Sequence, residues 1–373
     1  MVLKKLWNWQ QPDWPNFAFD AEALKAKETP FIQRSGLMQG IARHLAGDEK
    51  ITLTIEVLSD EAVKTSEIEG EYLNRDSVQS SIRRNLGLAT DLRRVKPAEQ
   101  GIAELSVEVH NTFAAPLTHQ SLFSWHRMVM KGRSDLDAMG GYRRHEEPMQ
   151  IISGRVDAPK IHFEAPPSET LQAEMDRFLA WFNATAPEGS SPLPMLTRAG
   201  IAHLYFVSVH PFEDSNGRLA RALVEKSLAQ SLRMPSLSAI SQTIHRKRKL
   251  YYDMLEASNT SNQIDGWLDY FSATLIEAQE HTIALVEFLI SKTKFFDRFR
   301  NALNARQDKA IERMFREGAG GFKGGLSAEN YISITGISRA TASRDLSDLV
   351  AKEVLSRTGE GKATRYELNL PQQ

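Results

Sequence analysis

The chain of 373 residues is long enough to form two or three domains with buried cores. Hydrophobic residues make up 41% and charged residues 25% of the chain, as in an ordinary globular protein, and the formal net charge of −1 indicates no overall preference for nucleic acid or membrane. The absence of cysteine excludes disulfides, thiol nucleophiles and cysteine zinc sites.

The start of the chain lacks the apolar segment of a secretory signal. No apolar run approaches the roughly 20 residues that are needed to span a bilayer. We therefore expect a cytoplasmic protein without a membrane partner.

Residues 1–95 begin with aromatic residues between prolines, and apolar residues then recur at helical intervals from Ile51 to Val63. A second helix is expected from Asp76 to Leu86, with Asp76 as its N-cap. We interpret residues 1–95 as a helical extension.

Residues 96–290 are predicted to be mostly helical, because apolar residues keep helical spacing over several stretches. These stretches are Gly101–Phe113, Thr118–Met130, Ser168–Asn183, Leu196–Val209 and, continuing past residue 290, Ile264–Phe299. The helical pattern fails between Gly140 and Pro167, where Met149, Ile151, Gly154 and Val156 predict a short β-hairpin.

Residues 291–373 have a different charge, with 15 basic and 10 acidic residues and hence a net charge of +5. We expect a short helix at Ser327–Tyr331, a turn, a second helix at Ser338–Lys352 and a hairpin within Val354–Tyr366. This order predicts a winged helix, which binds either DNA or protein. Contacts to DNA would come from the start of the second helix, at Arg339, Thr341, Ser343 and Arg344.

Residues 210–221 read His-Pro-Phe-Glu-Asp-Ser-Asn-Gly-Arg-Leu-Ala-Arg and lead into a helical run. Such a segment suits phosphate, because the free backbone N–H groups and the dipole of a helix start both attract anions. Ser215, Asn216 and Gly217 supply the turn, and Arg218 and Arg221 are three residues apart, so they can reach one polyphosphate together.

Two further side chains of this segment suit a reaction at phosphorus. His210 can accept a hydroxyl proton near neutral pH, and Asp214 offers hard oxygen ligands for Mg²⁺. Phe212 is expected to pack inward and fix the loop.

The segment resembles the motif of the Fic family, H-x-F-x-[D/E]-G-N-G-R-x-x-R, at every defined position except Ser215, where the family usually has glycine. The resemblance extends over about residues 1–290. It implies a mainly α-helical Fic core at 96–290 with a β-hairpin flap, after the extension at 1–95 and before the linker helix and winged-helix domain at 291–373. A left-handed backbone at Ser215 would cost roughly 1–2 kcal/mol.

The resemblance also implies a reaction, in which AMP passes from ATP to a Ser, Thr or Tyr hydroxyl of a target protein. His210 would be the general base and Asp214 would hold Mg²⁺. Asn216 and the backbone of Ser215 and Gly217 would steady the α-phosphate. Arg218 and Arg221 would bind the outer phosphates.

Two other segments match parts of a Fic site. Ile152, Ser153 and Gly154 fall in the flap that would pair with the target's backbone, although an ordinary exposed hairpin would have the same pattern. Asn259, with Tyr251 or Tyr252, would contact adenine, although tyrosines on a helix also serve as core packing.

Residues 65–70 read Thr-Ser-Glu-Ile-Glu-Gly and resemble the family's inhibitory pattern, [S/T]-x-x-x-E-[G/N], in the class II position before the core. By this resemblance Glu69 would pair with Arg221 and deny it to the γ-phosphate. The alternative for Glu69 is a solvated glutamate on a helix.

We therefore expect a protein adenylyltransferase that uses ATP and Mg²⁺ and is inhibited by Glu69. Two alternatives remain open: another Fic reaction on the same site (removal of AMP, or transfer of UMP or phosphocholine), and a DNA-binding regulator that senses nucleotide. The partners considered are a target protein, the protein itself, a second copy in a homodimer, and DNA.

Overall fold

The computed structural model describes residues 6–44, 47–88, 94–155, 158–236, 238–299, 301–316, 322 and 324–370. They divide into two compact units, Met1–Thr282 and Ile283–Gln373, and the division falls inside one long helix, α11 (Asp265–Phe299). Each unit is described by itself.

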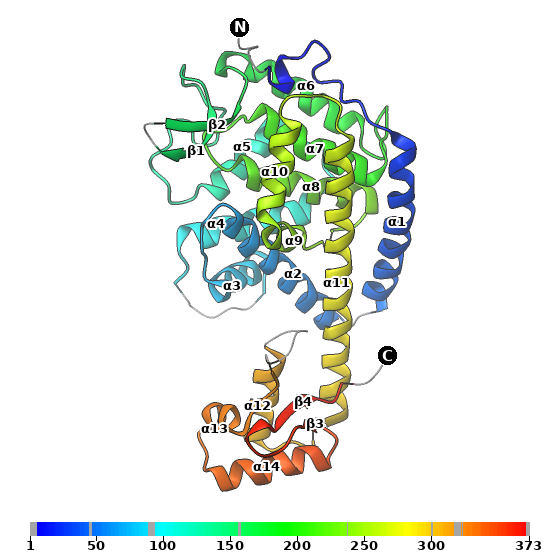
Figure 1. The fold of residues 1–373 in the computed structure, drawn as a ribbon, viewed down its shortest axis with the longest axis vertical. Helices are drawn as coiled ribbons and strands as arrows, with labels where there is room; N and C mark the ends of the chain where they lie inside the picture. Colours follow the sequence, from blue (N-terminus) through cyan, green and yellow to red (C-terminus); the bar gives the residue numbers. More distant parts are fainter. Residues whose placement is uncertain are drawn as a thin grey trace. The chain divides into compact units, whose positions relative to one another are not determined.

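The first unit is mainly helical, with one two-stranded sheet (Figure 1). Its helices besides α11 are α1 (Ala21–His44), α2 (Gly47–Ile68), α3 (Arg75–Asn85), α4 (Pro97–Thr112), α5 (His119–Val129), α6 (Leu171–Ala184), α7 (Met195–Val209), α8 (Asn216–Leu232), α9 (Ile240–Arg246) and α10 (Arg248–Ser258), with short 3-10 turns at Asn8–Gln10 and Ser168–Thr170. The helices expected in residues 96–290 are confirmed, with ends that differ by a few residues.

Helix α7 lies at the centre of this unit because it is apolar around its whole circumference. Tyr205 and Phe206 belong to a core shared with α6, whereas Ile201 and Leu204 belong to a second core that includes residues of α11. With both faces of α7 buried, its last residue and the loop after it are held in a fixed place. That loop begins at His210.

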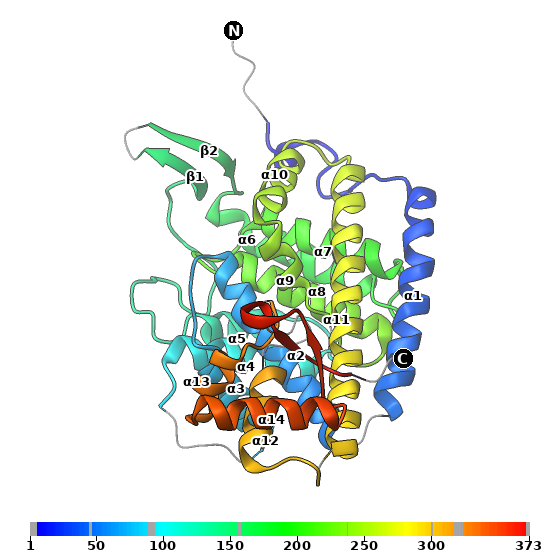
Figure 2. The same cartoon turned by 60° about the horizontal axis from the view of Figure 1, so that its bottom comes forward.

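The β-hairpin consists of β1 (Gln150–Arg155) and β2 (Ala158–Glu164), paired antiparallel from Gln150 opposite Glu164 to Arg155 opposite Ala158, with an irregularity between Ile151 and Ile152. Figure 2 shows that it projects from the helices at the edge of the unit. The prediction of a hairpin is confirmed, although Val156 lies outside the described residues.

Helix α1 was not predicted, and it contains Pro30, a residue that normally interrupts a helix. Contacts with α11 hold it in place. Phe31 is buried, Lys27 pairs with Asp269 at 2.5 Å and Arg34 pairs with Glu280 at 2.6 Å. Figures 1 and 2 both show α1 alongside α11. Tertiary packing thus outweighs local propensity here.

The aromatic residues at the start of the chain are also fixed by distant contacts. The Asn8 side chain donates to Ser208 Oγ at 2.8 Å, and the Asn8 backbone N–H donates to the Asn259 carbonyl at 2.7 Å. Trp9 Nε1 donates to the Glu164 carbonyl at 2.7 Å. The first residues of the described chain therefore tie together α7, the end of α10 and the hairpin.

The second unit contains α12 (Ala305–Phe315), α13 (Ala328–Thr335), α14 (Arg339–Ala351), β3 (Leu355–Thr358), a short 3-10 turn at Gly361–Ala363 and β4 (Arg365–Leu368). Gly336 ends α13 at a φ of 74°, which favours glycine, and Ser338 caps α14 by accepting from the Thr341 N–H. The predicted order of helix, turn, helix and hairpin is confirmed. None of the helices in the described part of the chain is long and apolar enough to cross a membrane.

One expected helix start was wrong. The N-cap of α3 is Asn74, whose side-chain oxygen accepts from the Ser77 N–H at 2.9 Å, and Asp76 lies inside the first turn. Asn74 adopts the extended backbone of a cap, with φ −78° and ψ 115°. The helix therefore begins earlier than Asp76.

Replacing this cap should weaken the packing of α3. We expect Asn74→Ala to lower the free energy of unfolding by about 1 kcal/mol, because the Ser77 N–H loses its acceptor. Asn74→Asp keeps an acceptor and should retain most of the stability. Urea unfolding followed by circular dichroism would measure both, and equal loss in the two variants would contradict the capping role.

Candidate functional site

The loop from His210 to Ser215 joins α7 to α8 through two residues with left-handed backbones. His210 has φ 50° and ψ 57°, and Ser215 has φ 71° and ψ 5°. Both are unfavourable for residues other than glycine, so the surrounding structure must hold them. Ser215 therefore carries the strain of a left-handed backbone.

Phe212 fixes the middle of this loop. Its side chain is fully buried and stacks on His126, with ring centroids 4.3 Å apart and ring planes 13° apart. The prediction that Phe212 packs inward is confirmed. Pro211 is buried with it, whereas Glu213 and Asp214, which follow the ring, are partly exposed.

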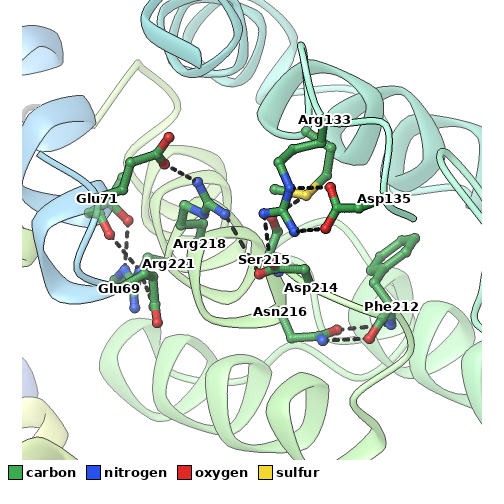
Figure 3. A network of polar contacts seen from close by, with 12 residues as sticks. Glu69, Glu71, Arg133, Asp135, Phe212, Asp214, Ser215, Asn216, Arg218 and Arg221 are labelled. Carbon is green, nitrogen blue, oxygen red and sulfur yellow. Dashed lines mark hydrogen bonds and ion pairs between the residues drawn. The ribbon is translucent and has the colours of Figure 1, made fainter. Parts of the chain in front are cut away.

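Asn216 closes the loop from its other end. Its Oδ1 accepts from the Phe212 N–H at 3.0 Å, and its Nδ2 donates to the Phe212 carbonyl at 2.8 Å (Figure 3). The sequence predicted that Asn216 would steady the α-phosphate, but both polar ends of its amide bind backbone here. In this structure its side chain holds the shape of the loop.

The His210 imidazole is partly exposed, and its Nδ1 lies 3.2 Å from the Val207 carbonyl. A carbonyl only accepts, so Nδ1 carries the proton and Nε2 keeps its lone pair. Burial lowers the pKa of His210 to about 4, with a smaller lowering from Arg143. The imidazole is therefore neutral near pH 7 and able to accept a proton at Nε2.

Arg143 holds the backbone of the same loop. Its buried guanidinium donates to the His210 carbonyl at 2.9 Å and to the Pro166 carbonyl at 2.5 Å, and its backbone N–H donates to the Pro211 carbonyl at 3.0 Å. It thereby joins the loop to the segment that follows β2. The sequence did not predict these contacts of Arg143.

Arg218 and Arg221 lie on α8 with 6% and 1% exposure, and each meets a carboxylate from the end of α2 (Figure 3). Arg221 Nη2 lies 2.7 Å from Glu69 Oε1, and Arg218 Nη1 lies 2.7 Å from Glu71 Oε2. The structure thus brings Glu69 to Arg221 and adds Glu71, which the sequence did not predict.

Thr65 completes the surroundings of Arg221. Its hydroxyl accepts from Arg221 Nε at 2.7 Å and its carbonyl accepts from Arg221 Nη2 at 3.0 Å. A Cβ added at Gly217 would lie 2.4 Å from Glu69 Oε1, so glycine is needed for the glutamate to approach the helix start. The Tyr252 hydroxyl donates to the other oxygen of Glu69 at 3.4 Å.

Asp214 is partly exposed, and its carboxylate lies 3.1 Å from Arg133 Nη1 and 3.7 Å from Arg218 Nη2. Mg²⁺ is commonly bound by one or two carboxylates together with phosphates and water, and an accessible carboxylate beside Arg218 fits that requirement. The described residues contain no cluster of three or more His, Asp or Glu side chains that could hold a metal ion by themselves.

The predicted flap residues lie at the solvent side of the hairpin. Ile152 is 56% exposed, Ser153 bonds to His162 Nε2 at 2.6 Å, and Gly154 has a φ of 93°. Since the sheet has only two strands, the outer edge of β1 has no partner strand within the described ranges.

The residues that were predicted to contact adenine differ in exposure and in their hydrogen-bond partners. Tyr251 is buried and its hydroxyl lies 3.0 Å from His203 Nε2, whereas Tyr252 is 39% exposed beside Glu69. Asn259 Nδ2 donates to the His162 carbonyl at 3.2 Å and so binds the hairpin. Of the three, only Tyr252 presents its ring near the arginine pair from an exposed position.

Two regions of the chain match known protein families. Residues 116–228 match the Fic/DOC family, and residues 7–88 match a domain of unknown function, DUF4172. The chain therefore contains a Fic/DOC family domain, preceded by a DUF4172 domain. The Fic domain thus contains the whole of the His210 loop and both arginines, whereas Glu69 and Glu71 belong to the DUF4172 domain.

Solved structures share the Fic fold. A Fic family protein from Desulfovibrio desulfuricans G20 superposes with a TM-score of 0.51 at 19% identity, covering 93% of this chain and 97% of that one. A Fic domain containing signaling protein from Bacteroides thetaiotaomicron VPI-5482 gives a TM-score of 0.52 at 17% identity, covering 70% and 98%. The fold class predicted from the sequence is confirmed.

Two curated relatives match part of the chain at 31% identity. One is "Protein adenylyltransferase Fic" of Culex quinquefasciatus, matched over 169 residues, which are 45% of this chain and 29% of that protein. The other is "Uridine 5'-monophosphate transferase" of Xanthomonas campestris pv. campestris (strain 8004), matched over 117 residues, 31% of this chain and 21% of that protein. The chain therefore covers less than a third of each relative.

The backbone at Ser215 gives a direct test of this loop geometry. We expect Ser215→Gly to be more stable than Ser215→Ala by about 1 kcal/mol, because only glycine adopts a φ of 71° without strain and both variants lose the contact of Ser215 Oγ with Met130 Sδ. Denaturant unfolding of the two variants would measure the difference. A more stable alanine variant would contradict a left-handed backbone at this position.

Proposed function

We propose that this chain transfers AMP from ATP to the hydroxyl of a protein side chain. The observation that carries the proposal is the pair of buried guanidinium groups, Arg218 and Arg221, at the start of α8 beside a neutral histidine. Buried arginines need anionic partners, and here these partners are carboxylates from another domain, which a polyphosphate could replace.

His210 would act as the base. The target hydroxyl would lose its proton to Nε2 while its oxygen bonds to the α-phosphorus, and pyrophosphate would leave with the electron pair of the broken P–O bond. The hydrogen bond to Val207 supports this role because it keeps Nε2 unprotonated. The histidine would then return the proton to solvent.

The start of α8 would supply the charge stabilisation. Backbone N–H groups of the loop and the helix dipole favour phosphate there, and Arg218 and Arg221 would bind the outer phosphates. Asp214 would hold Mg²⁺ together with those phosphates, and the bound ion would neutralise part of their charge. Asp214 would have to exchange its present contacts with Arg133 and Arg218 to do so.

Two carboxylates from the DUF4172 domain would inhibit this reaction. Glu69 occupies Arg221 and Glu71 occupies Arg218, so neither guanidinium is available to phosphate while both contacts persist. The sequence predicted one inhibitory glutamate, and we extend the proposal to the pair. Release would require movement of the end of α2.

The hairpin would receive the target protein. The exposed outer edge of β1 offers backbone N–H and carbonyl groups to an extended segment, which would give affinity with little dependence on the target's sequence. Such pairing would place a hydroxyl residue of the target beside the His210 loop, because Arg143 connects that loop to the end of β2.

Freeing Arg221 from Glu69 provides the main test of the proposed activity. We expect Glu69→Gly to increase transfer of labelled AMP from ATP by about tenfold or more, since a charge-assisted hydrogen bond is worth roughly 1.5–3 kcal/mol. Glu67→Gly is the matched control, because Glu67 pairs with Lys64 at the same end of α2 and should leave transfer near the wild-type level.

Two further measurements complete this experiment. Adding His210→Ala to Glu69→Gly should abolish labelling while ATP binding persists, and a folded Glu69→Gly variant without any labelling would contradict the proposed activity. Labelled UTP should be run in parallel, because one relative bears the name of a uridine 5'-monophosphate transferase. Transfer from UTP in preference to ATP would replace AMP with UMP in the proposal.

A second candidate function, DNA binding, is favoured by the exposed face of α14. Arg339 is 78% exposed, Ser343 and Arg344 are also exposed, and all three lie in the first two turns of the second helix of a helix–turn–helix. We infer that this face could enter a DNA groove. Arg339 lies 3.7 Å from Glu329, a surface contact that phosphate could readily replace.

Fluorescence anisotropy with a 20-base-pair duplex of mixed sequence would test this second function. We expect binding at low salt that weakens steeply as salt rises, and an Arg344→Ala variant that binds roughly fivefold more weakly or worse. Arg316→Ala removes an exposed arginine outside α14 and serves as control. Equal binding by both variants would exclude α14 as the contact surface.

A further inference from the structure

Arg218 also lines a cavity to which the His210 loop does not contribute. Between helices α2, α4 and α8 it contains about 590 Å³ of space, solvent at its mouth included. Its walls are largely apolar, with Leu58 from α2, Leu105 and Val109 from α4 and Ala229 from α8. Only Arg218 and Thr65 belong both to this cavity and to the surroundings of the arginine pair.

Several polar atoms on the cavity wall have no hydrogen-bond partner among the described residues. These atoms are Ser238 Oγ, His110 Nδ1 and Glu225 Oε1, and Ser238 is only 8% exposed. They come from three different parts of the chain. Buried polar atoms are nearly always hydrogen-bonded, so their gathering on one wall points to a ligand or water that satisfies them.

Two carboxylates lie on the wall of this cavity. Glu61 of α2 and Glu225 of α8 both line the cavity and interact electrostatically with each other. Glu61 accepts from the Ser241 N–H at 2.9 Å and from the Ser241 hydroxyl. Neither glutamate forms an ion pair with a lysine, arginine or histidine of the described chain, because Arg218, which also lines the cavity, pairs with Glu71 instead. The two carboxylates therefore have no cation paired with them.

The pKa values of Glu61, Glu225 and His110 agree with the lack of a paired cation. Burial raises the pKa of Glu61 to about 7, although Arg221 opposes the shift and Asp60 adds to it. Burial and the charge of Glu61 raise the pKa of Glu225 well above its usual value, and burial lowers the pKa of His110 on α4. Near neutral pH, Glu225 and His110 therefore favour their neutral forms and Glu61 is only partly ionised, whereas a bound cation would favour ionised carboxylates.

We propose that this cavity binds a small amphipathic amine, with its ammonium group between Glu61 and Glu225 and its hydrocarbon part against the apolar residues of α4 and α8. Ammonium donates three hydrogen bonds and carries the missing charge. A short alkyl chain fills the remainder, because apolar walls with a few convergent polar groups are typical of small-molecule sites.

The cavity also has a mechanical connection to the inhibitory contact, and this part rests on the proposed function. Glu61 and Thr65 are four residues apart and share one face of α2, and Glu69 follows directly after Ile68, the last residue of the helix. A ligand that bridges Glu61 on α2 and Glu225 on α8 stabilises the arrangement in which Glu69 contacts Arg221. The amine therefore opposes ATP binding.

Isothermal titration with n-hexylamine tests the site independently of any activity. We expect the wild type to bind n-hexylamine, and to bind neither hexanol nor hexanoate with comparable affinity. Glu225→Gln and Glu61→Gln should each weaken binding about tenfold or more, as loss of a charged hydrogen bond does. Glu188→Gln, at an exposed surface pair with Arg233, should change nothing.

Two other variants locate the amine. Ser106→Leu places a larger side chain on the cavity wall and should abolish binding, whereas His210→Ala should leave it unchanged because the His210 loop is separate from the cavity. No binding by the wild type, or equal binding in the two glutamine variants and the wild type, would overturn the proposed site.

ATP affinity measured with and without saturating n-hexylamine tests the connection to α2. The amine should weaken ATP binding in the wild type severalfold and have little effect in Glu69→Gly, where the contact with Arg221 is missing. Equal weakening in both would show that the amine occupies the nucleotide site, which would overturn the proposal. Failure of AMP transfer in Glu69→Gly would remove the proposed activity and leave the binding result intact.

Discussion

Two guanidinium groups with almost no exposure to water organise this protein. A buried arginine is costly unless anions and hydrogen-bond acceptors surround it. Arg221 obtains them from Thr65 and Glu69, and Arg218 obtains one from Glu71. Because these partners all come from the end of α2, the DUF4172 domain is needed for the electrostatic balance of the Fic domain as the structure shows it. Any phosphate that displaces these carboxylates must give the arginines comparable negative charge and hydrogen-bond acceptors.

The loop before α8 keeps a left-handed backbone at Ser215, although the Fic motif usually has glycine there. Ser215 and His210 both have left-handed backbones, and neither could hold that form in isolation. Phe212 in the core, the Asn216 amide on the backbone of Phe212, and Arg143 on the carbonyl of His210 all fix the same few residues. Serine is tolerated because so many contacts determine the backbone around it.

The sequence predicted what depends on local pattern. Helical spacing located most of the helices, failure of that spacing located the hairpin, and a dense motif located the His210 loop. It missed α1, because Pro30 argues against a helix and only packing on α11 overcomes it. It also missed Glu71, Arg133 and Arg143, which carry no motif and acquire their roles through contacts between residues far apart in the chain.

For Asn216 and Asn259 the sequence predicted contacts with a nucleotide, and in this structure each amide binds backbone. Residue type shows that an amide will form hydrogen bonds, but tertiary structure decides which nearby groups are its partners.

The first few residues of the described chain have a bearing on how this protein can be dissected. Asn8 and Trp9 reach α7, α10 and the hairpin, all of them outside the DUF4172 domain to which these residues belong. Shortening the chain from its amino end would therefore remove contacts that hold the hairpin at the same time as it removes Glu69 and Glu71. A truncated protein loses the anchoring of the hairpin as it gains free arginines, whereas single substitutions of the two glutamates separate those effects.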